Sequence, residues 1–225
     1  MDCGAVVRTL VQGQEEAYRA RLPALRLQLE DAYRSHAVAE AISLIGGRVV
    51  IDYYKFQRRE DVARLYSDPP PAAALAEIGQ LFERNSAHPA IYETAFSWQI
   101  SPGSQSLERV ALLLNVRPGQ ETNYRQWLAS GVAKELEPMW KVNDIYRHDV
   151  LLSEGSAIIL YECRNKYNAL VSSALPVAST IASMKAFRDP DTIRRLMREL
   201  VPIFDLDPHM PLVMFEEIQA WSEEE

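Results

Sequence analysis

The stretch GQEEAYR at residues 13–19 reappears as GQETNYR at residues 119–125, with five of seven positions identical. A second pair follows in the same order, because the β-rich stretch 48–54 resembles the stretch 156–162. A third apolar run closes each half of the chain. Three matches in one order indicate an internal repeat, and a repeat constrains the fold more than any single element does.

Each half is expected to begin and end with a strand. Apolar stretches at residues 6–11 and 110–116 open the two halves, and those at 91–100 and 212–218 close them. Apolar runs of this length, rich in Val, Ile, Leu and aromatic residues, are typical of strands. Two further strands joined by a tight turn are expected in the middle of each half.

Helices are expected in the intervals. Apolar residues recur every three or four positions over residues 124–136 and 22–29, the spacing of an amphipathic helix. Pro23 lies inside the second of these patterns, so it is expected to kink that helix or to mark its start. The tight turns are expected at residues 46–47 and 153–155, which contain glycine.

The order β-α-β-β-α-β, read twice, predicts an α+β protein built from tandem duplicated ferredoxin-like units. Such a unit leaves one face of its sheet open. Residues 109–116 are mostly apolar on both faces, unlike a strand that is wet on one side. We therefore expect the halves, 1–102 and 107–225, to form an intramolecular dimeric α+β barrel with an apolar interior.

Composition narrows the function classes. The net charge of −7, the pI near 5.2 and the lack of a long basic cluster disfavour nucleic acids and anionic membranes as partners. Cys3 and Cys163 are the two cysteines, too few for a disulfide framework or a zinc site. With no secretory signal and no apolar run of membrane length, the sequence predicts a cytoplasmic protein. Homodimer formation is left open.

Standard cofactor motifs are missing from the sequence. There is no glycine-rich nucleotide loop, no HExxH and no GxSxG, and the four histidines lack the spacing of metal ligands. We therefore predict no metal and no cofactor. Chemistry would then depend on a shaped apolar cavity and a few polar side chains.

His148, Asp144 and His36 are the candidates for catalysis. Asp144 and His148 alternate with Tyr146 in an expected strand, so these three would share one face of the sheet. If that face lines the barrel, His148 and Asp144 could move a proton near neutral pH, while Tyr146 could contact the substrate. His36, before the corresponding strand of the first half, is the third catalytic candidate. The alternative is that these residues lie on an outer, solvated face.

Further residues are candidates for substrate binding. Trp98 and Trp140 could stack on a planar ligand, with ordinary core packing as the alternative. Tyr53 and Tyr161 stand at equivalent places in the repeat, which favours a structural role and leaves hydroxyl donation open. Asn115 in an apolar strand would need a hydrogen-bond partner if it is buried, either a ligand or the backbone.

The run RVALLLNVRPGQE at residues 109–121, followed by Tyr124, resembles the opening of the SchA/CurD-like proteins of aromatic polyketide pathways. These proteins belong with the dimeric α+β barrel superfamily, which also contains polyketide cyclases and cofactor-independent monooxygenases. The resemblance is best over residues 107–220. It implies a tailoring enzyme that acts on a polycyclic aromatic polyketide.

Two reactions fit this resemblance. One is oxygenation of a phenol or anthrone by a cofactor-independent monooxygenase, and the other is aldol-type cyclisation and aromatisation. Both need a dry pocket, a base and hydrogen-bond donors for enolate charge. The resemblance slightly favours oxygenation. A third reading, from another class, is a ligand-binding module without catalysis.

Overall fold

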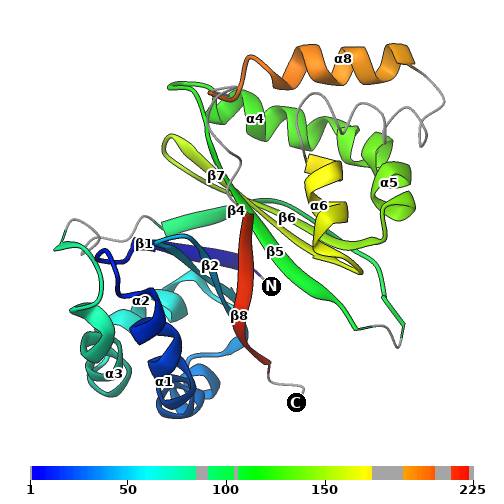
Figure 1. The fold of residues 1–225 in the computed structure, drawn as a ribbon. Coiled ribbons are helices and arrows are strands. Elements are labelled where there is room, and N and C mark those ends of the chain that lie inside the picture. The colour runs from blue at the N-terminus through cyan, green and yellow to red at the C-terminus, as the bar shows by residue number, and fades with distance from the viewer. Residues whose placement is uncertain (1, 85–90, 104–105, 174–189, 206–213, 223–225) are drawn as a thin grey trace. The chain divides into compact units, whose positions relative to one another are not determined.

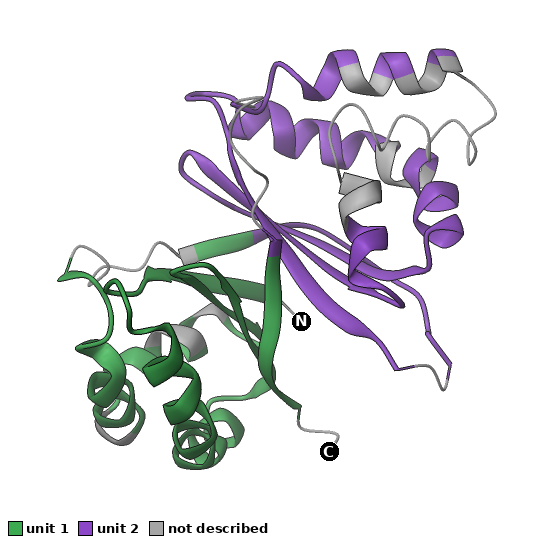
Figure 2. Cartoon of the chain, in the orientation of Figure 1, with its two compact units in different colours: residues 1–93, 215–225 green, residues 94–214 purple. Residues whose placement is uncertain are grey.

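A computed structural model describes residues 2–84, 91–103, 106–173, 190–205 and 214–222. The elements follow the expected β-α-β-β-α-β order in each half of the chain, with helices and strands mixed throughout (Figure 1). The α+β class is therefore confirmed. The chain divides into two compact units, unit 1 with residues 1–93 and 215–225 and unit 2 with residues 94–214 (Figure 2).

The described residues of unit 1 form an antiparallel sheet and three helices. Its strands are β1 (Asp2–Thr9), β2 (Val38–Gly46), β3 (Val49–Phe56), the start of β4 (Ile91–Gln99) and most of β8 (Met214–Ser222). Strand pairing gives the order β4-β1-β3-β2-β8. The helices are α1 (Glu15–Ser35), α2 (Arg59–Ser67) and α3 (Pro69–Gly79).

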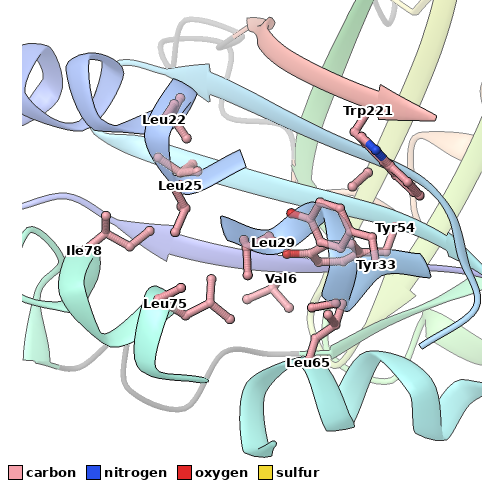
Figure 3. Packing of buried hydrophobic residues seen from close by; sticks show 14 of the residues in the cluster. Val6, Leu22, Leu25, Leu29, Tyr33, Tyr54, Leu65, Leu75, Ile78 and Trp221 are labelled. Carbon is pink, nitrogen blue, oxygen red and sulfur yellow. The ribbon is translucent and has the colours of Figure 1, made fainter. Parts of the chain in front are cut away.

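The core of unit 1 lies between α1 and one face of this sheet. Successive side chains of a strand point to opposite faces, so alternate residues of β3 reach the helix. One buried apolar cluster joins them to the apolar stripe of α1 (Figure 3), with members that include Val50, Tyr54, Phe56, Leu22, Leu25 and Leu29. The three- and four-residue spacing of the leucines places them on the buried side of α1, as expected from the sequence.

Helix α1 differs from the expectation at its start. It begins at Glu15, eight residues before Pro23, so Pro23 does not mark its beginning. Proline removes the backbone N–H that would bond to the carbonyl of Arg19. The packing of the leucine stripe holds the helix together across this missing bond.

Unit 2 repeats this plan with different details. Its strands are β5 (Glu108–Asn115), β7 (Ser156–Cys163), β6 (Ile145–Ser153) and the end of β4, and β7 pairs antiparallel with both β5 and β6. Helix α4 (Glu121–Trp127) continues through the π-helical turn η2 (Leu128–Val132) into α5 (Ala133–Val142). Helices α6 (Lys166–Ser173) and α8 (Pro190–Leu200) are the other helices among the described residues of this unit.

The last strand of each half, β4 or β8, is divided between the two units. β4 pairs with β1 through residues 91–93, whereas its residues from Thr94 onward belong to unit 2. β8 pairs with β2 and belongs to unit 1 from Phe215 onward. The predicted halves 1–102 and 107–225 describe sequence repeats rather than these units, and they stay a prediction. So does the joining of the halves in one barrel.

The two β-hairpins have matching registers. β2 and β3 are joined by Gly47 and Arg48, and β6 and β7 by Glu154 and Gly155. Each hairpin also has a register shift at its far end, after Val38 in β2 and after Ile145 in β6. The turns lie within or next to the expected stretches.

This register corrects one expected equivalence. Tyr54 stands opposite Ala41, and Tyr161 stands opposite His148, at the same place in each hairpin. Tyr54, and not Tyr53, is therefore the counterpart of Tyr161. The sequence match was aligned one residue off, and a shift of one residue moves a side chain to the other face.

No helix among the described residues combines the length and the apolar character needed to cross a bilayer.

Candidate functional site

A small cavity lies in unit 1, between helix α1 and the sheet. Tyr18, Tyr33 and Tyr54 line it with Trp221, and its polar lining includes Arg8, Ser43, Asp52 and Gln219. We call it the tyrosine-lined cavity. Its volume is about 20 Å³, which is room for about one water molecule.

An ion pair lies on the sheet side of this cavity. Arg8 Nη2 donates to Asp52 Oδ2 at 2.5 Å, and the two side chains are only 9% and 6% exposed. Ser43 Oγ donates to the other oxygen, Oδ1, at 2.7 Å. Asp52 is on the central strand β3 with Ser43 directly opposite on β2, so the strand register brings these groups together. Tyr18 of α1 is hydrogen-bonded to Ser43 from above.

Two polar atoms at the cavity have no hydrogen-bond partner. They are the Arg8 Nε donor and the Gln219 Oε1 acceptor, both buried. A buried polar group without a partner costs about 1–3 kcal/mol, so such groups usually bind a water or a ligand. One donor and one acceptor at the same cavity fit a hydroxyl group, which can accept from Arg8 and donate to Gln219.

The phenols around the cavity are neutral at physiological pH. Burial raises the pKa of Tyr18, Tyr33 and Tyr54 well above the ordinary value, and it raises that of Tyr66 to about 12. Tyr54 and Tyr66 share a hydrogen bond of 3.0 Å between their hydroxyl oxygens. For Arg8, burial is the largest single influence and lowers the pKa, but the Asp52 carboxylate and the neighbouring tyrosines together outweigh it, so the pKa is raised. The guanidinium is therefore a fixed positive charge.

An aromatic wall covers one side of the cavity. Tyr33 of α1 lies with its ring centroid 5.1 Å from that of Trp221 and 6.3 Å from that of Tyr54. Figure 3 shows the rings of Tyr33 and Tyr54 side by side, with Trp221 close to them. Such a wall can contact the face or the edge of a planar ligand.

Four of the predicted site residues meet in unit 2. His148 stacks on Tyr161 with ring centroids 4.8 Å apart and an interplanar angle of 11°. Trp140 meets the imidazole edge-on at 4.4 Å, and Trp98 lies 4.9 Å from Trp140. Phe96 adds a further ring at 5.8 Å from His148. We call this group the histidine cluster.

The histidine cluster holds His148 as a neutral ring. Burial lowers its pKa from 6.5 to about 3, and neither ring nitrogen has a hydrogen-bond partner. A base with so low a pKa takes up little proton at neutral pH. The geometry favours packing or neutral hydrogen bonding over proton transfer by this residue.

The other two members of the predicted alternating triad lie apart from His148. Asp144 precedes β6 in the left-handed region, with φ of 50°. The register shift after Ile145 interrupts the alternation, so Ile145 shares one apolar cluster with Val150 and Leu152. Tyr146 is half-buried, and its carbonyl accepts a hydrogen bond from the backbone of Ile100. The expected single face of Asp144, Tyr146 and His148 is wrong because of this bulge.

Three more predicted residues lie elsewhere. His36 is in unit 1 at the end of α1, where its Nε2 lies 2.8 Å from Asp68 Oδ2 and its Nδ1 lies 2.8 Å from the carbonyl of Ala32. Tyr53 is fully buried on the face of β3 that turns away from α1. Asn115 is exposed at the end of β5.

A second buried ion-pair cluster lies in unit 2, on the sheet face away from the helices. Arg147 contacts Asp149 at 2.6 Å and Glu162 at 3.1 Å, and Glu162 also contacts Arg109 at 2.8 Å. Ser97 donates to Asp149 at 2.6 Å. An apolar face is expected here from the sequence of β5 alone, whereas the charges come mainly from β6 and β7. Among the described residues no cluster suited to a metal ion is found.

Sequence reasoning missed the polar residues of the tyrosine-lined cavity. Arg8, Ser43 and Gln219 come from three different strands, and nothing in the sequence shows that they converge. Asp52 did carry a signal, because it is a carboxylate in the middle of the apolar strand Val49–Phe56. A buried acid needs a hydrogen-bonding or charged partner, so Asp52 by itself indicates that polar residues lie near it.

No family model and no curated protein matches the sequence. Solved structures do. An anthrone oxidase-like protein aligns with a TM-score of 0.62 at 13% identity, over 100% of this chain and 94% of its own. A candidate monooxygenase from Fusobacterium nucleatum aligns with a TM-score of 0.62 at 7% identity, over 99% and 94% of the two chains.

A candidate monooxygenase from Lactobacillus acidophilus gives a TM-score of 0.59 at 5% identity, over 99% of this chain and 96% of its own. The chain has the fold of these proteins. Identities this low establish the shared fold alone, and activity has to be argued from the site.

Proposed function

We propose that this protein is a cofactor-independent monooxygenase that oxygenates a phenol or anthrone, and that its reaction site is the tyrosine-lined cavity. The observation that carries the proposal is the Arg8–Asp52 pair beside an unfilled donor and acceptor. Structures with the same fold are described as monooxygenase-like and anthrone oxidase-like, which supports this reaction class. A polycyclic intermediate of an aromatic polyketide pathway is the proposed substrate.

The residues suit the removal of a proton from such a substrate. Asp52 is the base, because it is a carboxylate close to the cavity and its second oxygen is held by Ser43. Arg8 carries a fixed positive charge that stabilises the phenolate or enolate as it forms. The neutral tyrosines add hydroxyl donors without adding charge.

The deprotonated substrate is the electron source in this proposal. An anthrone loses a proton to Asp52, and the resulting carbanion transfers electrons to dioxygen. One oxygen atom becomes the new quinone carbonyl, and the other leaves as water with the two hydrogens of the methylene. Dioxygen is the oxidant and the substrate the reductant, so no further reactant is needed.

The cavity is too small to hold the proposed substrate without movement of the protein. A tricyclic ligand needs far more room than one water, so side chains have to move when it binds. Helix α1 lines one side of the cavity with Leu22, Leu25 and Arg26, and Pro23 removes one of its backbone hydrogen bonds. We propose that movement of α1 near Pro23 admits the ligand.

Two other functions remain as proposals of lower rank. A polyketide cyclase would use the same base and the same donors, and it would release product without consuming oxygen. A ligand-binding module would bind the aromatic compound without turnover. The catalytic roles of His148, Asp144 and His36, and substrate binding by Trp140, Tyr146, Trp98, Tyr53, Tyr161 and Asn115, stay predictions.

Oxygen uptake by the purified protein with anthrone tests the proposal. Uptake with formation of anthraquinone, in protein without a bound chromophore, supports it. Asp52→Asn should abolish the uptake. Asp149→Asn is a matched control, because Asp149 is also buried between a serine and an arginine. Absence of oxygen uptake with anthrone, together with cyclisation of an uncyclised poly-β-ketone chain, points to the cyclase, and binding without any turnover points to the binding module.

A further inference from the structure

The two units place different side chains on the same framework. Ala41 stands opposite Tyr54 in the hairpin of unit 1, and His148 stands opposite Tyr161 at the same register position in unit 2. Ala41 lines the tyrosine-lined cavity. The methyl group of unit 1 is thus replaced by an imidazole ring in unit 2.

The polar lining of unit 1 is replaced as well. In unit 1 the strand partners Val6, Asp52 and Ser43 form one cross-strand row. The matching row in unit 2 is Leu112, Ile159 and Val150. An aspartate and a serine therefore become two aliphatic residues.

Arg8 and Gln219, the other two polar residues of the cavity, also have apolar counterparts in unit 2. Arg8 stands opposite Val50, and its counterpart Leu114 stands opposite Ala157. Gln219 is the sixth residue of β8, and Phe96 is the sixth residue of β4. Each of the four polar residues named at the cavity thus has an apolar counterpart in unit 2.

Two features near these positions are the same in both units. The rings of Tyr18 and Phe82 meet edge-on with centroids 5.4 Å apart, and those of Tyr124 and Phe204 do so at 4.9 Å. An isolated bridge joins Leu10 to Phe82, and another joins Val116 to Phe204. The replacements of polar by apolar residues described above therefore occur beside aromatic pairs and bridges that both units have.

We infer that each chain has a single reaction site, in unit 1, and that the imidazole of His148 fills the corresponding space in unit 2. His148 is held between Tyr161 on its face and Trp140 at its edge, and it is only 7% exposed. The count of reaction sites rests on the proposed function. The filling of unit 2 by His148 does not.

The filling is tested without any substrate. His148→Ala should lower Tm, and millimolar imidazole should raise Tm of this variant without raising that of the wild type. Leu151→Ala is the control, because Leu151 is also buried, on the other face of β6, and its removal leaves no flat space between aromatic rings. If His148→Ala does not fold alone, it is refolded with and without imidazole. No effect of imidazole on the His148→Ala variant, in Tm or in refolding, overturns the inference.

The number of sites is tested by calorimetric titration with anthrone under nitrogen. One equivalent should bind per chain, and the triple substitution Arg8→Leu, Ser43→Val and Asp52→Ile should abolish that binding. Two equivalents per chain, or one that survives the triple substitution, contradict a single site in unit 1. If the wild type binds none, the proposed function fails, and the imidazole experiment alone decides whether His148 fills unit 2.

Discussion

Arg8 Nη2 lies 2.5 Å from Asp52 Oδ2 beneath helix α1, in the core of unit 1. Removing two charges from water is costly, and a well-packed aliphatic core is often as stable as a buried ion pair or more so. Unit 2 has such a core at the matching positions, with Leu114 and Ile159. The fold itself does not need the pair, which supports a chemical role for it.

This comparison predicts the stability of two variants. Asp52→Ile alone should lower the free energy of unfolding by about 3–5 kcal/mol, because it leaves the Arg8 charge buried without a partner. The triple substitution that adds Arg8→Leu and Ser43→Val should recover the loss and can exceed the wild type by about 1–4 kcal/mol. Urea denaturation of the three proteins measures this. A triple variant less stable than Asp52→Ile would show that unit 1 cannot adopt the aliphatic core of unit 2.

The buried, neutral imidazole of His148 should make the protein less stable in acid. Its pKa is about 3 in the folded protein and near 6.5 in the unfolded chain, so the unfolded chain takes up the proton first. The stabilisation is present above pH 6.5 and is lost as the pH falls toward 3, by up to about 1.4 kcal/mol per pH unit. His148→Phe should remove this part of the pH dependence. Parallel stability curves for wild type and variant between pH 3 and 6.5 would contradict the buried neutral imidazole.

The raised pKa of the Tyr66 phenol should make the protein less stable in alkali. Burial raises its pKa to about 12, so its phenol stays neutral in the fold while the unfolded chain ionises near pH 10. The stabilisation is complete below pH 10 and is lost as the pH rises through 12. Tyr66→Phe should weaken this dependence and cost about 1 kcal/mol at neutral pH through the lost hydrogen bond to Tyr54. A phenolate signal that appears before unfolding in the wild type and is missing from Tyr66→Phe would argue against the burial of Tyr66.

His36 has a structural role in this account. It joins the end of α1 to Asp68, between α2 and α3, and Asp68 is 44% exposed. His36→Ala should therefore lower the free energy of unfolding by only about 1 kcal/mol. His36→Gln, which keeps one hydrogen-bonding group, should recover part of this. Loss of turnover in a folded His36→Gln protein would instead support the catalytic role expected from the sequence.

The order of elements could be predicted from the sequence because each depends on local patterns. The spacing of Leu22, Leu25 and Leu29 predicts a helix that packs on a sheet, and that packing is present. Some members of the histidine cluster could also be predicted from the sequence, since Trp140 and His148 are of rare residue types. Their contact was not predicted, because it depends on how α5 packs against β6.

Features that depend on register were out of reach. The bulge after Ile145 interrupts the expected alternation of Asp144, Tyr146 and His148, and a one-residue shift in the repeat exchanged Tyr53 for Tyr54. The Arg8–Asp52 pair joins residues 44 positions apart, and only the pairing of β1 with β3 brings them together. Pairing of this kind follows from the whole sheet and not from any window of sequence.

The most direct test is the rate of oxygen uptake with anthrone by the wild type and by the Arg8→Leu, Ser43→Val, Asp52→Ile triple variant, with folding of both checked by circular dichroism. The account predicts uptake and anthraquinone formation by the wild type and neither by the folded triple variant. Equal uptake by the two proteins would contradict the central claim that the Arg8–Asp52 pair of unit 1 carries the reaction.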